Sequence, residues 1–193
     1  MSMSGKTIAL FIVFVTMLFL AGYEAQAHTI SFSLTPEIAV KKSSTATAKA
    51  QGGVAIDTRL TYDFSSSFFI QAAAGFRVFS PSGGGSDWIP YRGYTGWSFS
   101  TGAGYRFPAF YRFGKTEAVP GFTARVQASF MKYLYTELHY FYPGLEIEPS
   151  LRVFNLSDDR VHLQIGVPVA WNLQRDLDLF FTAGLSLQLL FSF

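Results

Sequence analysis

The most constraining feature of this sequence is a strict alternation of side-chain type between residues 177 and 193. Every second residue is apolar, and most of the residues between them are polar or small. Because a β-strand directs successive side chains to opposite faces, this segment has one apolar and one mostly polar face. In water such an apolar face must pack against protein, whereas in a bilayer it contacts the acyl chains. The apolar positions are Leu177, Leu179, Phe181, Ala183, Leu185, Leu187, Leu189, Phe191 and Phe193.

The first 27 residues have the three parts of a secretory signal peptide. Lys6 supplies a short positive segment, residues 8–20 are almost wholly apolar, and Ala25-Gln26-Ala27 has the small residues of a cleavage site. The apolar core of about 13 residues is shorter than the roughly 20 residues of a transmembrane helix, which disfavours an uncleaved anchor. We therefore expect a signal peptide at 1–27 and one mature domain at 28–193.

The composition of the chain excludes several classes of protein. There is no cysteine, so neither a disulfide nor a thiolate metal site can form. Aromatic residues make up 18% of the chain and charged residues only 15%, compared with about 25% charged residues in soluble domains. The formal net charge of +2 gives no indication of a nucleic-acid partner.

The same period-two alternation occurs in seven earlier segments, which predicts eight strands in total. A transmembrane β-strand needs roughly 9–11 residues, and an even number of strands returns both termini to the same side. Aromatic residues near the segment ends are typical of the girdles at membrane interfaces. The predicted segments are 28–42, 54–64, 68–79, 94–107, one beginning near 122, 145–154, 161–171 and 177–193.

Two features fit this pattern less simply. Pro36, Pro149 and Pro168 lie within predicted strands, and we expect them at rims or bulges because proline has no ladder donor. The stretch 122–142 is too long for one crossing. We expect its second half to form either a tall hairpin closed at Pro143-Gly144 or a short helix.

A signal peptide, eight alternating segments and a terminal phenylalanine resemble the small outer-membrane β-barrels of diderm bacteria, of the OmpA, OmpX and OmpW type. The resemblance implies an all-β fold, an eight-stranded antiparallel transmembrane β-barrel in contact with outer-membrane lipids. The end of the chain also looks like the signal read by the barrel-assembly machinery, which implies that machinery as a partner during biogenesis. The residues that carry this assembly signal are Gly184, Leu187, Leu189, Phe191 and Phe193.

Charged residues gather on the predicted inner face of the barrel. The interior of an eight-stranded barrel is just wide enough for its own side chains. We therefore expect arginines and carboxylates to pair and fill the lumen, because each unpaired charge would cost several kcal/mol. The alternative, implied by the resemblance to OmpW-type barrels, is a narrow channel for small or apolar solutes. The expected network consists of Glu37, Asp57, Arg59, Asp63, Arg77, Arg106, Arg125, Glu146, Glu148 and Arg152.

The sequence does not meet the chemical requirements of an outer-leaflet lipid-modifying enzyme, which needs a histidine with a serine and an acid in reach. His139 follows Glu137 but has no adjacent serine pattern, so we expect no catalysis. The same two residues supply too few ligands for zinc, and neither a metal nor a cofactor is expected. A soluble periplasmic β-sandwich or a lipocalin-like barrel is a further alternative, because such a protein points its apolar strand faces inward.

The predicted loop 80–93 is the better candidate for a function. A glycine-rich run is followed there by Trp88, Tyr91 and Arg92, residue types that are enriched in binding hot spots. These three residues predict contact with an extracellular partner. The alternative is that the aromatic side chains anchor the loop to lipid headgroups. The sequence thus favours a structural or surface-interaction role.

Overall fold

The computed structural model describes residues 28–41, 49–79, 94–113, 116–133, 139–157, 160–173 and 179–193. The predicted signal peptide and the whole of the predicted functional loop 80–93 lie outside these residues. Within the described residues there is no helix that is long and apolar enough to cross a membrane. The strands are β1 (His28–Lys41), β2 (Lys49–Asp63), β3 (Phe68–Phe79), β4 (Tyr94–Arg106), β5 (Tyr111–Phe113), β6 (Thr116–Tyr133), β7 (His139–Ser157), β8 (Val161–Gly166), β9 (Val169–Leu173), β10 (Leu179–Gly184) and β11 (Ser186–Ser192).

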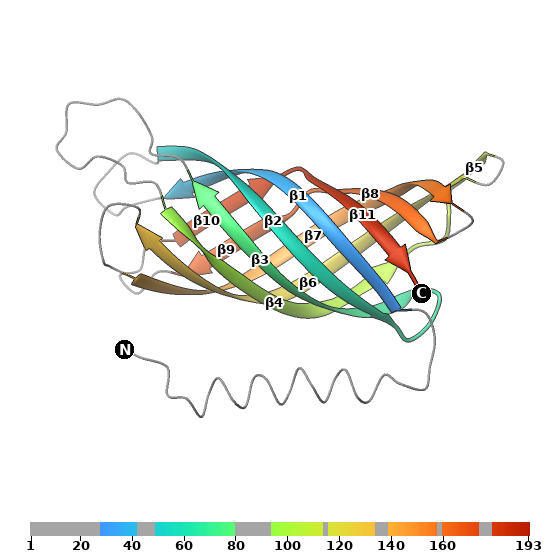
Figure 1. Ribbon diagram of the computed structural model, residues 1–193, viewed down its shortest axis with the longest axis horizontal. Coiled ribbons are helices and arrows are strands. Elements are labelled where there is room, and N and C mark those ends of the chain that lie inside the picture. Colours follow the sequence, from blue (N-terminus) through green and yellow to red (C-terminus); the bar gives the residue numbers. More distant parts are fainter. Residues whose placement is uncertain are drawn as a thin grey trace.

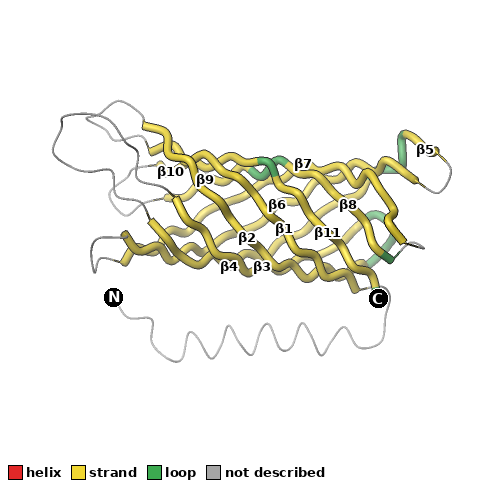
Figure 2. Tube along the Cα trace, turned by 45° about the horizontal axis from the view of Figure 1, so that its top comes forward, coloured by secondary structure: helices red, strands yellow, loops and turns green. Residues whose placement is uncertain are grey.

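The strands close into an antiparallel barrel (Figures 1 and 2). Neighbours in the chain pair from β1 to β4, β4 pairs with β6, and β6 pairs with β7. The pair β8 and β9 lies along β7, and the pair β10 and β11 lies along β1 and closes the ring. Each of these pairs counts as one wall strand, and β5 lies outside the wall. The wall therefore has eight strands, which confirms the predicted fold.

Three prolines account for the division of two wall strands. Pro36, Pro149 and Pro168 each accept a backbone hydrogen bond but have no N–H to return one. The pairing register is the same on either side of each break, so the prediction that these prolines lie at rims or bulges is wrong. The wall tolerates a missing donor without shifting register. The bonds that the prolines accept come from Val167 to Pro149 (2.9 Å), from Gly184 to Pro168 (3.0 Å) and from Leu185 to Pro36 (3.1 Å).

The two longest strands, β6 and β7, form a hairpin. Its pairing extends from Val119 opposite Arg152 to Lys132 opposite His139. The prediction of a tall hairpin is therefore correct, and the alternative of a short helix is wrong for the described part of this segment. The predicted closure at Pro143-Gly144 is also wrong, because these two residues pair with β6 in the middle of the ladder. Proline and glycine did not mark a turn here because the missing donor is again tolerated within the wall.

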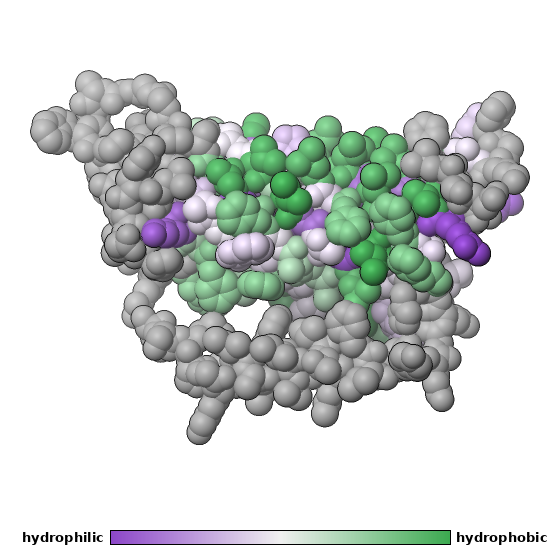
Figure 3. Space-filling model, viewed as in Figure 1, coloured by the Kyte–Doolittle hydropathy of each residue, from purple (hydrophilic) through white to green (hydrophobic). Residues whose placement is uncertain are grey.

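The outer face of the barrel is apolar and the inner face is polar. Phe32, Ile56 and Leu187 are 53%, 58% and 49% exposed, whereas their neighbours Asp57 and Gln188 are buried. Apolar side chains cover most of the described surface on the face drawn in Figure 3. The alternation in the sequence therefore corresponds to a lipid-facing exterior and a polar interior. The soluble alternative, with its apolar face inward, is wrong.

The two ends of the barrel differ, and we name them for what they carry. The terminus end has His28, Phe193 and the turn at 64–67, and the opposite end, the loop end, is where segments 42–48 and 80–93 connect the strands (Figure 1). Strand β5 pairs with the first residues of β6 to form a hairpin that extends beyond the wall at the terminus end. Arg112 and Glu117 form an ion pair on this hairpin, where the arginine side chain is 74% exposed.

A layered lumen as the candidate functional site

Seven charged side chains form a buried network across the middle of the lumen. They come from β1, β2, β3, β6 and β7, and each is at most 7% exposed. Alternation along each strand brings them inside, and closure of the barrel brings the strands within reach of one another. We call this set the middle network: Glu37, Asp57, Arg59, Arg77, Arg125, Glu146 and Glu148.

Glu148 accepts three hydrogen bonds from side chains on three other strands. Its carboxylate accepts hydrogen bonds from Arg59 Nη1 at 2.6 Å, from Arg125 Nη2 and from Gln188 Nε2. Gly166 lies beside it on β8, and a Cβ at that position would collide with the carboxylate. The glycine therefore provides the space in which the glutamate meets its three donors. Hydrogen bonds to a charged acceptor are the stronger kind, so Glu148 holds β2, β6 and β11 together.

Arg77 and Arg125 connect the middle network to further strands. Arg77 Nη2 lies 3.2 Å from Glu146 Oε2, and Arg77 Nη1 lies 3.7 Å from Glu37 Oε2. Arg125 donates to Glu146 on the neighbouring strand and to Gln71 on β3. These contacts join β1, β3, β6 and β7, so the network spans the lumen rather than lining one side of it.

The remaining three predicted lumen residues lie nearer the terminus end. Arg106 Nη1 lies 2.6 Å from Asp63 Oδ1, and its guanidinium carbon is 4.5 Å from the centroid of the Phe69 ring. Arg152 lies on β7, two residues after Ser150, and is half-buried. The ten predicted residues thus separate into a buried network of seven, one ion pair and one further arginine.

An apolar layer near the loop end was missed in the sequence analysis. Phe79, Ala39 and Met131 are buried inside the lumen, and Tyr94 and Tyr142 pack against them. A Cβ at Gly53 would overlap the Phe79 ring, so a glycine again makes room for a large inward side chain. The signal was present in the sequence, because Phe79 has the same strand parity as Gln71 and Arg77.

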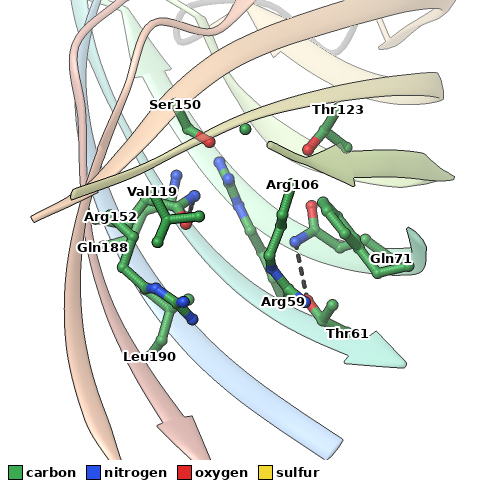
Figure 4. Close-up of a pocket in the computed structure, with 13 residues that line it drawn as sticks. Arg59, Thr61, Gln71, Arg106, Val119, Thr123, Ser150, Arg152, Gln188 and Leu190 are labelled. Atoms are coloured by element: carbon green, nitrogen blue, oxygen red, sulfur yellow. Dashed lines mark hydrogen bonds between the residues drawn. The ribbon is translucent and has the colours of Figure 1, made fainter. Parts of the chain in front are cut away.

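A small cavity lies between the middle network and the terminus end (Figure 4). Its volume of about 20 Å³ is enough for roughly one water molecule. Its wall includes three arginines and three glutamines, contributed by β2, β3, β4, β7, β8 and β11. These polar lining residues are Arg59, Gln71, Arg106, Arg152, Gln164 and Gln188.

No group of three or more histidine, aspartate or glutamate residues is arranged to hold a metal ion in the described part of the chain. His162 is buried on the inner face of β8. The side chain of His139, and Glu137 entirely, lie outside the described residues. So do Trp88, Tyr91 and Arg92, the predicted surface contacts.

The residues of the predicted assembly signal lie on the strand that closes the barrel. Gly184 pairs with Glu37, and Leu187, Leu189 and Phe191 pair with residues 34, 32 and 30 of β1. Leu187 and Leu189 face outward, and Phe193 follows β11 with 79% of its surface exposed.

No protein-family model matches the sequence, and a search of curated proteins gives no match. Solved structures do match. Neisserial surface protein A has a TM-score of 0.60 at 12% identity, covering 88% of this chain and all of that one. The attachment invasion locus protein Ail of Yersinia pestis has a TM-score of 0.48 at 10% identity, covering 86% of this chain and 98% of that one. The outer membrane enzyme PagL has a TM-score of 0.46 at 15% identity, covering 80% and 97%.

The similarity to Neisserial surface protein A shows a shared fold. This shared fold is consistent with the closed eight-stranded wall and with the apolar exterior of the barrel. An apolar exterior of this kind faces a bilayer rather than water. The chain therefore has the fold of the small eight-stranded outer-membrane β-barrels.

Proposed function

We propose that this chain is a closed, non-conducting outer-membrane barrel with a structural or surface-interaction role and without catalytic activity. The observation that carries the proposal is the pair of layers that cross the lumen. The middle network links opposite strands through buried ion pairs, and the Phe79 layer lies nearer the loop end.

Each layer opposes the passage of a solute for a different physical reason. A hydrated ion would have to separate Arg59 from Glu148, and breaking a buried ion pair costs about 3–5 kcal/mol. Beyond it, the apolar layer offers no polar partner to replace the ion's hydration. The alternative function, a narrow channel for small or apolar solutes, needs a continuous path through both layers.

Planar-bilayer recording tests this proposal. The purified wild-type barrel should give no discrete openings, and the double variant E148A/F79A should give openings because it truncates one side chain in each layer. The matched variant E117A/F68A truncates the same residue types at Glu117, on the hairpin outside the wall, and at Phe68, on the outer face, and should stay silent. Discrete, voltage-tolerant openings of the wild-type protein would refute the closed barrel in favour of the channel.

The surface role is proposed for loop 80–93, with Trp88, Tyr91 and Arg92 as contacts to an extracellular partner. The sequence has three tryptophans, so the W97F/W171F variant keeps Trp88 as its single tryptophan. In vesicles whose lipids carry bromine near the headgroups, the fluorescence of Trp88 should not be quenched if the loop stands clear of the membrane. Strong quenching would instead support the anchoring of the loop to lipid headgroups.

We also propose cleavage after Ala27 and recognition of the chain's end by the barrel-assembly machinery. Intact-mass measurement of the protein from outer membranes should give a chain that begins at His28. In reconstituted assembly, F193A should fold more slowly than wild type, whereas F110A, on the β4–β5 connection, should fold at the wild-type rate. Equal rates for wild type and F193A would contradict the assembly role.

The absence of catalysis is tested separately. Mass spectrometry of lipid A from cells with and without the chain should give the same acyl composition. A change in acyl number that depends on the chain would overturn the non-enzymatic proposal.

A further inference from the structure

We propose that the cavity at the terminus end of the lumen is a binding site for one small monatomic anion, with chloride as the expected ion. The site goes beyond the proposed function, because an anion site that is open only at the terminus end requires no conduction through the barrel. The cavity lies between the middle network and the Asp63–Arg106 pair, and Figure 4 shows side chains from several strands around a common space.

The chemistry of the cavity wall favours an anion. Arg59, Arg106 and Arg152 line it, whereas no aspartate or glutamate among the described residues does. The other polar lining residues are amides and hydroxyls, all of which can donate a hydrogen bond. A guanidinium has five N–H donors in a fixed fork, so an arginine that binds one carboxylate keeps donors for a second acceptor. A cation would find no carboxylate in this wall.

The second, independent observation is an unmet donor. Arg59 is 2% exposed, and its Nε has no hydrogen-bond partner among the described residues; the Nε atoms of Arg77 and Arg125 are also without one, but of the three only Arg59 lines the cavity. Of its two terminal nitrogens, Nη1 donates a hydrogen bond to Glu148 at 2.6 Å, and Nη2 lies 3.6 Å from Asp57 in an ion pair. A buried donor without an acceptor is costly, and more so when it belongs to a charged group. An anion in the adjoining cavity would supply the missing acceptor.

The size and the surroundings of the cavity narrow the class of ligand. A volume of about 20 Å³ has room for a particle of about the size of one water molecule, which suits a monatomic anion better than phosphate, sulfate or an organic acid. The Arg106 and Asp63 side chains are 18% and 16% exposed, so solvent reaches this end of the lumen. By contrast, Arg125 and Glu148 in the middle network are 1% and 2% exposed. The anion would therefore enter from the terminus end and stop at the middle network.

Two measurements on the full barrel in detergent micelles test the site. Chlorine-35 NMR should show excess broadening of the chloride resonance by wild type, and bromide should remove that broadening by competition. The variant R152Q removes one lining charge and should reduce the excess broadening at least fivefold. The matched variant R112Q removes an exposed arginine outside the wall and should broaden chloride as wild type does.

The second measurement needs no variant, so it keeps the proposal testable if R152Q does not fold. Crystals grown in sodium bromide should give an anomalous peak inside the cavity, within hydrogen-bond distance of Arg59 Nε. A peak without anomalous signal means that only water occupies the cavity and overturns the proposal. Equal chloride broadening by wild type and a folded R152Q also overturns it.

Discussion

Arg59 on β2 and Glu148 on β7 meet across the lumen, with 2.6 Å between Nη1 and Oε2, although their strands stand diametrically opposite in the eight-stranded wall. The contact fixes the width of the barrel at this level, because neither side chain reaches further without breaking it. Glu148 also accepts from Arg125 and Gln188. Its loss therefore leaves donors from three other strands unmatched.

The first prediction concerns this carboxylate. We expect E148A to lower the free energy of unfolding by about 3–5 kcal/mol, since it leaves buried arginines without their acceptor. E148Q keeps the shape and one acceptor oxygen and should cost less than E148A. Urea unfolding in detergent micelles, followed by the gel shift between folded and unfolded barrel, measures both.

The control for this prediction is E117Q, which makes the same glutamate-to-glutamine change as E148Q. The Arg112–Glu117 ion pair is exposed on the hairpin, and exposed pairs contribute only about 0–1 kcal/mol. Equal losses from E117Q and E148Q would contradict a structural role for the middle network.

The second prediction concerns the apolar layer. Phe79 is fully buried inside the lumen, and F79A should cost about 3–5 kcal/mol by leaving a cavity there. F68A removes the same side chain from the outer face, where lipid or detergent fills the space, and should cost less. If heat unfolding gives the two variants the same midpoint, Phe79 does not pack in the lumen as described.

The third prediction concerns the close approach of β4 and β6. A Cβ at Gly102 would overlap the backbone oxygen of Ala124 and lie 2.7 Å from the Arg125 Cα. Backbone cannot move aside as a flexible side chain does, so G102A should cost about 1–3 kcal/mol or more. G52A is the matched control, because nothing lies within 4 Å of a Cβ built there. A G102A barrel as stable as G52A would contradict the β4–β6 packing.

The fourth prediction concerns the lipid-facing side of β11. Leu187 points outward near the middle of the wall, and an arginine at the bilayer midplane costs about 2–4 kcal/mol in such barrels. L187R should therefore reduce the folded fraction in phospholipid vesicles by far more than L187A does. Similar folded fractions for the two variants would mean that position 187 does not face the bilayer core.

Much of the fold follows from the period-two pattern alone. The alternation from Leu185 to Leu190 predicts which side chains face lipid, because a strand in a closed barrel has only an outer and an inner face. It also identifies Leu190 as an apolar residue on the inner face, where it lines the cavity. The three prolines do not lie at rims or bulges as predicted, because each lacks an N–H donor but its own carbonyl still accepts a hydrogen bond from the adjacent strand.

The candidate site was less accessible to sequence reasoning. Strand parity places Arg59 and Glu148 in the lumen, but which carboxylate an arginine meets depends on the stagger between strands, which the sequence pattern does not specify. Glycines beside large inward side chains, such as Gly166 beside Glu148, indicate where those side chains lie in the lumen. They become interpretable only when the register brings each glycine next to a particular side chain.

The central claim is that the apolar face of each wall strand contacts lipid while the polar face fills the lumen. The chain has no cysteine, so single cysteines at positions 185 to 190 can each carry one spin label in vesicles. The structure predicts that labels at 185, 187 and 189 collide with dissolved oxygen, which concentrates in the bilayer, and that labels at 186, 188 and 190 do not. Labels at 186, 188 and 190 that are the more accessible to oxygen would contradict the account.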